Sequence, residues 1–512
     1  MPSPSPLGRA SIVTAATLGS RVLGFARDAG TAAILGAGPL ADALMAALAL
    51  PLLARRLLAE GAFNAALIPA LSRAAAPGGE AGARPRAVAG GTLLLLCAAL
   101  VALAGIGAVF MPALITLLAP GFEVGGERAD LAVQCGRIAL LYLPLAGAAA
   151  VYGGIANAGH RVALPALAPI LANLVVLGAI VWLVLEGWIG TAQTARAMAI
   201  ATVLAGVAQL ALMMLAARGN PAWPCVTTPD WSAARAVLRA SAPALLFAGL
   251  SQLRLLIVAA VVSSDPGSVS ALNYAQRLVD LPLGLVGASA GAVLVPLLAA
   301  GGRTAGREAT GALLAALALA LPAAAGLALL AEPIVSVLYQ RGGFTAADAH
   351  ATGWLLTALA FSLPAQGAER VLAATALSHG LTRPVEKIAL TSLANCLALA
   401  IGLGLGLGPV AAACAIAVSA TVSAATMTML LAGHRLLSFD AATGRHLRTL
   451  LGGTALMAVA VGGLAWLWPG SAEPTLAAAV RLAALVGVGL VAYGGCVLGL
   501  RRQSGAKPQN TA

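Results

Sequence analysis

Long apolar stretches are the feature of this 512-residue chain that most constrains its fold. A transmembrane helix needs about 20 consecutive, mostly apolar residues, and we count fourteen such stretches between polar breaks. The predicted spans lie at residues 10–36, 40–71, 88–118, 130–157, 163–186, 194–217, 237–262, 269–299, 310–339, 350–376, 385–406, 409–433, 447–468 and 475–499. The connections between them are too short to hold a soluble domain, so the sequence predicts a helical membrane protein.

The composition excludes the common soluble classes. Hydrophobic residues make up 60% of the chain and charged residues only 9%, whereas roughly a quarter of the residues in a soluble domain are charged. Aromatic residues make up 4%, and Ala, Leu, Gly and Val dominate, which is not the pattern of a transmembrane β-barrel. We therefore expect an all-α integral membrane protein with no nucleic-acid partner.

The distribution of Lys and Arg predicts the orientation. Cytoplasmic connections of helical membrane proteins carry an excess of these residues. With the N-terminus placed in the cytoplasm, 18 of the 30 basic residues fall in cytoplasmic breaks or at the span ends beside them. The opposite side receives four, namely Arg128, Arg196, Arg341 and Arg481. This asymmetry favours about 14 transmembrane helices with the N- and C-termini in the cytoplasm.

Short blocks recur at an offset near 220 residues. Residues 171–174 (LANL) resemble 393–396 (LANC), and residues 65–69 (AALIP) resemble 292–296 (AVLVP). Such repeats are typical of transporters whose two six-helix lobes surround a central cavity that opens alternately to each side. The expected segments are an N-terminal lobe at 1–218, a C-terminal lobe at 219–434, and two further helices with a cytoplasmic tail at 435–512.

Eight arginines belong to neither side and lie within predicted spans, where each needs compensation. A charge at the bilayer centre costs about 2.5–3.5 kcal/mol on insertion scales, so these side chains must pair with acids or line a wet cavity. They are Arg21, Arg27, Arg55, Arg56, Arg137, Arg254, Arg277 and Arg370. Asp28, Asp42, Glu60 and Asp280 accompany them within the spans and are the candidate pairing or cavity acids.

The arginines of the first two spans are the main candidates for substrate binding. Arginine presents a planar, permanently charged fork of donors that suits phosphate. Arg27, Arg55 and Arg56 therefore either bind an anionic substrate, such as a phosphate or diphosphate, or form a salt-bridged clamp between helices. Gly24 and Pro51 lie beside these charges and mark either hinges or sites of close helix packing.

No arrangement of residues indicates catalysis, a cofactor or a metal site. The five histidines fall in or near loops, the six cysteines are scattered, and the chain has no Walker loop and no GxSxG motif. We therefore expect a transporter and not an enzyme. A cation-coupled multidrug exporter is the alternative from another class, but it predicts an acidic cavity. A non-enzymatic scaffold protein would leave the intramembrane arginines unexplained.

Several sequence blocks carry a resemblance to a known family. They are residues 20–28 (SRVLGFARD), 36–38 (GAG), 42–43 (DA), 50–51 (LP), 55–63 (RRLLAEGAF), 119–122 (APGF), 274–278 (YAQRL) and 343–346 (GFTA). Together they closely resemble the MurJ (MviN) family, lipid II flippases of the multidrug/oligosaccharidyl-lipid/polysaccharide exporter superfamily. The resemblance covers most of the chain and departs from the family's usual residues at Ala49, Leu52 and Gln276.

The resemblance implies a lipid flippase of the bacterial inner membrane. Its substrate would be lipid II, the undecaprenyl-diphosphate-linked disaccharide-pentapeptide, turned from the cytoplasmic to the periplasmic leaflet. The last two spans would form a groove for the lipid tail, and membrane lipids and cell-wall synthesis proteins would be the other partners. The family's cavity arginines correspond to Arg21, Arg27, Arg55 and Arg277, and its acids to Asp42 and Glu60. A flippase for another polyprenyl-diphosphate-linked glycan is the alternative with the same chemistry.

Overall fold

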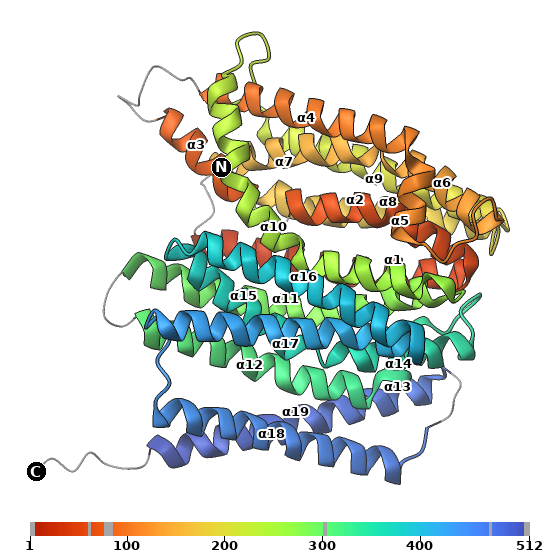
Figure 1. Ribbon diagram of the computed structural model, residues 1–512, viewed down its shortest axis with the longest axis vertical. Coiled ribbons are helices and arrows are strands. Elements are labelled where there is room, and N and C mark those ends of the chain that lie inside the picture. The colour runs from red at the N-terminus through yellow and green to blue at the C-terminus, as the bar shows by residue number, and fades with distance from the viewer. Residues whose placement is uncertain (1–5, 60–62, 76–84, 301–304, 471–473, 506–512) are drawn as a thin grey trace, which may run out of the picture. The chain divides into compact units, whose positions relative to one another are not determined.

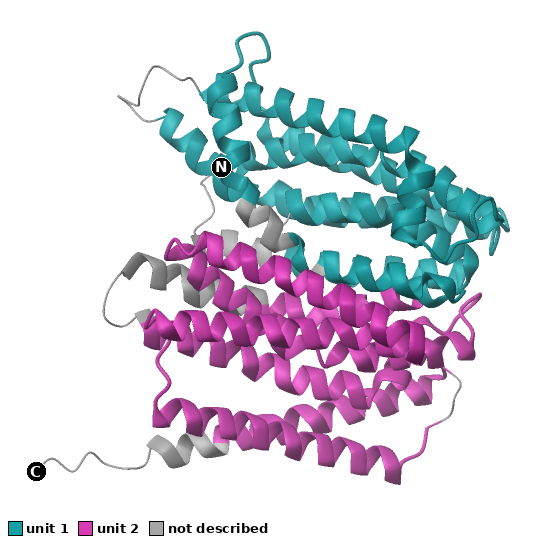
Figure 2. Ribbon diagram, viewed as in Figure 1, with its two compact units in different colours: residues 1–270 teal, residues 271–512 magenta. Residues whose placement is uncertain are grey.

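The computed structural model describes residues 6–59, 63–75, 85–300, 305–470 and 474–505. These residues form nineteen α-helices and one short 3₁₀ helix, and none of them lies in a β-strand (Figure 1). The all-α prediction is therefore confirmed. The chain divides into two compact units, residues 1–270 and 271–512 (Figure 2).

The first unit contains the helices from α1 to α10. Their bounds are α1 (Pro6–Leu35), α2 (Pro39–Ala59), α3 (Asn64–Ala75), α4 (Pro85–Val109), α5 (Met111–Leu118), α6 (Glu127–Ala139), α7 (Tyr142–Ala158), α8 (Ala163–Leu185), α9 (Ala192–Ala217) and α10 (Trp231–Val261), followed by η2 (Val262–Ser264). Helix α1 packs along α8, α2 packs on α6 and α7, and α10 packs on α4, α2 and α3. Because α10 packs on these helices, the first unit includes residues beyond 218. The lobe boundary at residue 218 stays a prediction.

The second unit contains the remaining helices. Their bounds are α11 (Ser268–Ala300), whose first turn lies in the first unit, α12 (Ala305–Leu329), α13 (Ala331–Tyr339), α14 (Ala346–Ala360), α15 (Leu363–Ser378), α16 (Thr382–Leu407), α17 (Pro409–Gly433), α18 (Ala441–Leu467) and α19 (Leu476–Gly505). Helices α18 and α19 form an antiparallel hairpin, and α18 packs on α12 (Figure 1). The hydroxyl group of Tyr493 donates to the carbonyl of Ala318 at 2.7 Å, which ties α19 to α12.

Six helices of the first unit recur in the second in the same order. The first residues of α4 to α9 and of α12 to α17 differ by 217 to 221 positions. The packing recurs as well: α8 packs on α9 as α16 packs on α17, and α7 lies between α4 and α9 as α15 lies between α12 and α17. This repeat has the spacing that the sequence blocks indicate.

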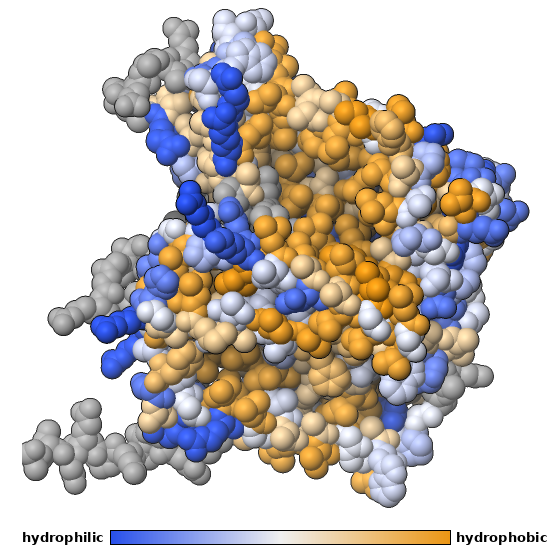
Figure 3. Space-filling view, viewed as in Figure 1, coloured by the Kyte–Doolittle hydropathy of each residue, from blue (hydrophilic) through white to orange (hydrophobic). Residues whose placement is uncertain are grey.

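The helices carry apolar surfaces suited to a bilayer. Among the described residues, nine helical segments are long and apolar enough to cross a membrane, so the predicted number of fourteen is approximate. Hydrophobic side chains cover the middle of the helices on the face drawn in Figure 3, and hydrophilic side chains gather towards the helix ends. Helices α1 and α2, which hold Arg21, Arg27, Arg55 and Arg56, are not among the nine segments.

Several helices begin at polar caps, which satisfy the backbone N–H groups of the first turn. Thr191 and Thr194 form a reciprocal capping box at the start of α9, and Thr345 and Asp348 form another at the start of α14. Asp230 accepts hydrogen bonds from Ser232 and Ala233 at the start of α10. These hydrogen bonds lower the pKa of the Asp230 carboxyl group below its ordinary value, and the bond from the backbone of Ala233 has the largest effect.

The connection between α9 and α10 lies against the first turns of α4. The backbone N–H groups of Cys225 and Asp230 donate to the carbonyls of Arg86 and Ala87, at 2.9 and 3.0 Å. A side chain at Gly90 would place its Cβ atom 1.9 Å from the carbonyl oxygen of Cys225. Glycine is therefore required at residue 90 for this backbone-to-backbone approach.

The thiol of Cys225 has two hydroxyl neighbours in this connection. Its Sγ atom lies 3.2 Å from the Oγ1 atom of Thr227 and 3.4 Å from that of Thr228. Hydrogen bonds from Thr227 and Thr228, led by the Thr227 hydroxyl group, lower the pKa of the thiol to about 6. This cysteine is therefore expected to be a thiolate at neutral pH.

Candidate functional site

Arg27 lies at the contact between α1 and α8, where two side chains hold its guanidinium group. Its Nε and Nη2 atoms donate to Oδ1 of Asp28 at 3.0 and 2.7 Å, and its Nη1 atom donates to Oδ1 of Asn173 at 3.1 Å. The side chains of Arg27 and Asp28 are 15% and 16% exposed. The charge is thus paired, but it is not sealed from its surroundings.

Asn173 fixes α8 against α1 at this point. Its Nδ2 atom donates to the backbone carbonyl of Ser20 at 3.0 Å, while its Oδ1 atom accepts from Arg27. A Cβ atom at Gly24 would lie 3.3 Å from Nδ2, so glycine leaves the space that this amide occupies. Helix α1 continues past Gly24 without a break, which agrees with close packing there, and the hinge role stays a prediction.

Arg55 and Arg56 lie in the last turns of α2, after Pro51, and their side chains are half-buried. The helix continues through Pro51. The charges of Arg55 and Arg27 both act on the phenol group of Tyr142 in α7, and this phenol donates to Oε1 of Gln209 at 3.4 Å. Two arginines from different helices therefore lie within electrostatic range of one buried hydroxyl group.

Arg277 and Asp280 belong to α11 in the second unit, and both are half-buried. Asp280 accepts a hydrogen bond from Nε2 of Gln276 at 2.8 Å. Gln276 therefore supports Asp280 with a neutral donor. Of the other predicted site residues, Arg21 is half-buried in α1, and Glu60 lies outside the described residues.

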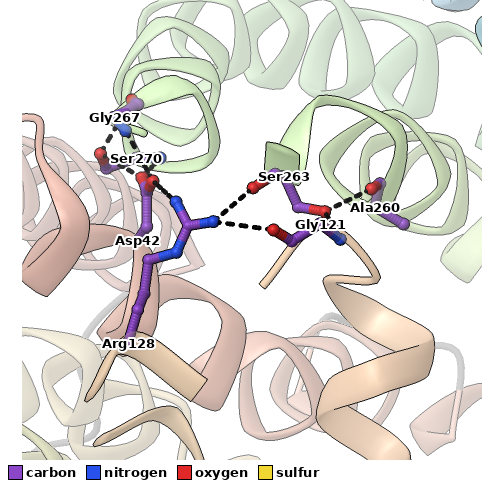
Figure 4. Close-up of polar contacts among 7 residues, drawn as sticks. All are labelled: Asp42, Gly121, Arg128, Ala260, Ser263, Gly267 and Ser270. Carbon is purple, nitrogen blue, oxygen red and sulfur yellow. Dashed lines mark hydrogen bonds and ion pairs between the residues drawn. The ribbon is translucent and has the colours of Figure 1, made fainter. Parts of the chain in front are cut away.

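Asp42 has a different environment, because its side chain is completely buried. Its Oδ2 atom accepts from the backbone N–H of Gly267 at 2.6 Å, and its Oδ1 atom accepts from the backbone N–H and the hydroxyl group of Ser270 at 2.8 and 2.7 Å (Figure 4). Gly267 has a φ of +88°, a conformation that favours glycine. The carboxylate thus holds the turn before α11 against the first turn of α2.

Arg128 completes this cluster from α6. Its Nη1 atom lies 3.6 Å from Oδ2 of Asp42, which is an ion pair and not a hydrogen bond. Its Nη2 atom donates to the carbonyls of Gly121 and Ser263 at 3.0 and 2.9 Å, and its guanidinium group lies 4.0 Å from the ring centroid of Phe122. We refer to Asp42, Arg128, Gly121, Ser263, Gly267 and Ser270 as the Asp42 cluster (Figure 4).

Sequence reasoning identified Asp42 but not the residues around it. The charge distribution places Arg128 in a non-cytoplasmic connection, and nothing in the sequence pattern marks Ser263 or Ser270. The sequence signal for this cluster lies in the family-like segments. Asp42 belongs to the segment 42–43 and Gly121 to the segment 119–122, and the two segments meet at Arg128. Among the described residues, no group of three His, Cys, Asp or Glu side chains could hold a metal ion.

The repeated helical bundles, the apolar spans and the charges held between helices define a multi-pass membrane protein with the architecture of a transporter. The chain belongs to the lipid II flippase MurJ family, because the model of that family matches residues 31–477. A probable lipid II flippase MurJ of Rhizobium tropici is 32% identical over 342 residues, which are 65% of this chain and 63% of the relative. A probable lipid II flippase MurJ of Bdellovibrio bacteriovorus is 31% identical over 396 residues, which are 76% of this chain and 75% of the relative.

Solved structures show the same fold. A lipid II flippase MurJ in an inward closed conformation has a TM-score of 0.79 at 21% identity, covering 96% of this chain and 99% of its own. An inward-facing multidrug resistance transporter of the MATE family has a TM-score of 0.66 at 17% identity, covering 81% of this chain and 94% of its own. At these identities the likeness concerns the fold alone.

Proposed function

We propose that this protein turns lipid II from the cytoplasmic to the periplasmic leaflet of the bacterial inner membrane. The reaction would make and break no covalent bond, so the protein would be a transporter. Membership of the MurJ family supports this proposal, as do relatives that bear the name lipid II flippase.

The observation that carries the proposal is the setting of Arg27. Three of its five N–H groups donate to Asp28 and Asn173, and no other described residue accepts from the remaining two. Because the charges of Arg55 and Arg27 act on the same tyrosine, Tyr142, the two guanidinium groups would together provide a cationic site between helices. A diphosphate has the charge and the acceptor oxygens that such a site would bind.

In this proposal the lobes at 1–218 and 219–434 surround a cavity that opens alternately to each side of the membrane, and both termini are cytoplasmic. Arg21, Arg56 and Arg277 would contribute further positive charge, balanced by Asp28 and Asp280. Residues 435–512, which contain the α18–α19 hairpin, would hold the lipid tail.

Complementation tests the proposal in a bacterium whose own lipid II flippase can be depleted. The wild-type chain should restore growth and clear the lipid II that accumulates in the inner leaflet, whereas Arg27→Ala should fail although it reaches the membrane in normal amounts. Arg341→Ala is the matched control, because that arginine is exposed and donates a hydrogen bond to the carbonyl of Val337 in the last turn of α13.

A second variant tests the geometry around the arginine. Asn173→Ala keeps every charge but removes the amide that orients Arg27, so it should reduce flipping less than Arg27→Ala does. Normal complementation by Arg27→Ala, or accumulation of another lipid-linked glycan in place of lipid II, would refute the proposed function.

A further inference from the structure

A pocket of about 410 Å³ lies on the first unit between the end of α8 and the beginning of α9. Trp182 and Trp188 form one wall, with their ring centroids 5.3 Å apart in an edge-to-face arrangement. The floor contains the small side chains of Ala197 and Ala201, and Arg196 lies at the end nearest the connection between the two helices. We refer to this feature as the α8–α9 groove.

The groove extends along α9 from a polar end to an apolar end. Arg196, Ile200 and Leu204 follow one another at intervals of four residues, and all three line it, so they lie on one face of the helix. Eight residues of α-helix span about 12 Å. Ile200 and Leu204 are exposed, and both α8 and α9 are apolar enough to cross a membrane. The groove therefore begins at the depth of lipid headgroups and continues into the hydrocarbon region.

Arg196 is held in place at the polar end. Its Nε atom donates to Oε1 of Gln134 in α6 at 2.8 Å, and its terminal NH₂ groups have no hydrogen-bond partner among the described residues. None of the residues that line the groove is acidic. Tryptophan side chains are typical of the membrane–water interface, so the aromatic wall and the guanidinium group lie at matching depths.

We propose that the α8–α9 groove binds a phospholipid of net negative charge from the non-cytoplasmic leaflet. The phosphate accepts hydrogen bonds from the terminal NH₂ groups of Arg196, and one acyl chain lies over Ala197 and Ala201 as far as Leu204. The complementary charge favours an anionic lipid over a zwitterionic one, because a choline headgroup would place a second cation beside the guanidinium group. This site is separate from the Arg27 site and does not depend on the transported substrate.

Fluorescence quenching tests the proposal on the full chain. Five tryptophans are replaced by Phe so that only Trp182 and Trp188 emit; they are Trp223, Trp231, Trp354, Trp466 and Trp468. The protein is placed in nanodiscs of phosphatidylcholine that contain increasing fractions of phosphatidylglycerol with brominated acyl chains. Phosphatidylglycerol should reach half-maximal quenching at a mole fraction about fivefold lower than brominated phosphatidylcholine does, which is the effect of about one favourable charge at the membrane surface.

Matched variants separate the site from general lipid contact. Arg196→Gln keeps an amide donor toward Gln134 but removes the charge, and it should abolish the fivefold preference. Arg341→Ala removes another predicted non-cytoplasmic arginine and should retain the preference. Ala197→Leu should weaken quenching by both lipids, because it fills the floor of the groove.

Three results would overturn the proposal. The first is equal quenching by the two brominated lipids in the wild-type background, and the second is a preference that persists in Arg196→Gln. The third is displacement of the brominated lipid by an equimolar amount of an undecaprenyl-diphosphate-linked glycan, since the groove would then hold a substrate tail.

Discussion

Replacement of Asp42 by Asn should destabilise the first unit strongly, although the two side chains have almost the same shape. Both carboxylate oxygens of Asp42 accept a backbone N–H group, one from Gly267 and one from Ser270. An amide has only one acceptor oxygen, so its NH₂ group would face a backbone N–H group in either orientation. The same change leaves Arg128 without its buried counter-charge.

The expected loss in the free energy of unfolding is about 3–5 kcal/mol. At 3.6 Å, opposite unit charges attract by about 5 kcal/mol at an effective dielectric constant of about 20, before the cost of desolvation. Removing one partner of a buried ion pair costs about 3–5 kcal/mol in proteins. Ser270→Ala removes one hydrogen bond to the carboxylate and should cost less, about 1.5–3 kcal/mol.

The assay is unfolding of the purified protein by titration with dodecyl sulfate in mixed micelles, followed by tryptophan fluorescence. Asp265→Asn is the control, since Asp265 lies in the same turn with its side chain exposed, and it should change the free energy of unfolding by less than about 0.5 kcal/mol. Asp42→Asn and Ser270→Ala should not be additive, because the two side chains are in direct contact through a shared hydrogen bond. An Asp42→Asn variant as stable as the Asp265→Asn control would refute this account of the Asp42 cluster.

Three further predictions concern the connection between α9 and α10. Gly90→Ala should destabilise the protein, because its Cβ atom would lie 1.9 Å from a carbonyl oxygen. Gly105→Ala in the same helix is the control, because its Cβ atom would meet nothing within 4 Å. It should stabilise the protein by about 0.5–1 kcal/mol in the same titration. In a variant whose only cysteine is Cys225, the rate of alkylation by iodoacetamide should rise with pH around a midpoint of about 6. Thr227→Val should move that midpoint upward. An unchanged midpoint would contradict the hydrogen bond between Thr227 and the Cys225 thiol. Asp230→Ala should cost about 1 kcal/mol as the loss of a helix cap. Because the pKa of Asp230 is lowered in the folded protein, this contribution should be present at neutral pH and disappear as the pH falls below about 4, so that wild type and variant converge in acid.

Hydropathy predicted where the helical segments lie but not where they break. The predicted span at 88–118 is two helices, α4 and α5, that meet at Phe110, and the span at 310–339 is α12 and α13, which meet at Leu330. Both junction residues are apolar, so a search for polar breaks passes over them. Proline is the signal that marks these junctions. Pro112 and Pro333 lie in the first turns of α5 and α13, and Pro364 lies in the first turn of α15, which follows α14 within the predicted span at 350–376. Proline is tolerated there because the first turn of a helix lacks backbone partners.

The candidate site was predictable only where its residues are close in sequence. Arg27 and Asp28 are neighbours, and the structure pairs them. The sequence marks Asn173 only as part of a repeated block, because its contact with Arg27 spans 146 positions. That contact depends on how α1 and α8 are rotated about their axes, and neither charge nor hydropathy along the chain determines this rotation.

Intramembrane charged groups differ in burial and in the number of hydrogen bonds and ion pairs that they make within the protein. This difference separates structural charges from candidates for substrate binding. Asp42 is completely buried, and its two oxygens accept three hydrogen bonds in addition to the ion pair, so no part of the carboxylate is exposed to contact a substrate. Arg27 keeps an exposed fraction of 15% and uses three of its five N–H groups within the described residues. A substitution at Asp42 should therefore act mainly through stability, whereas Arg27→Lys should leave the fold intact and lower the proposed flipping, because lysine keeps the charge but loses the planar fork. Normal folding of Asp42→Asn together with unfolding of Arg27→Lys would reverse this assignment.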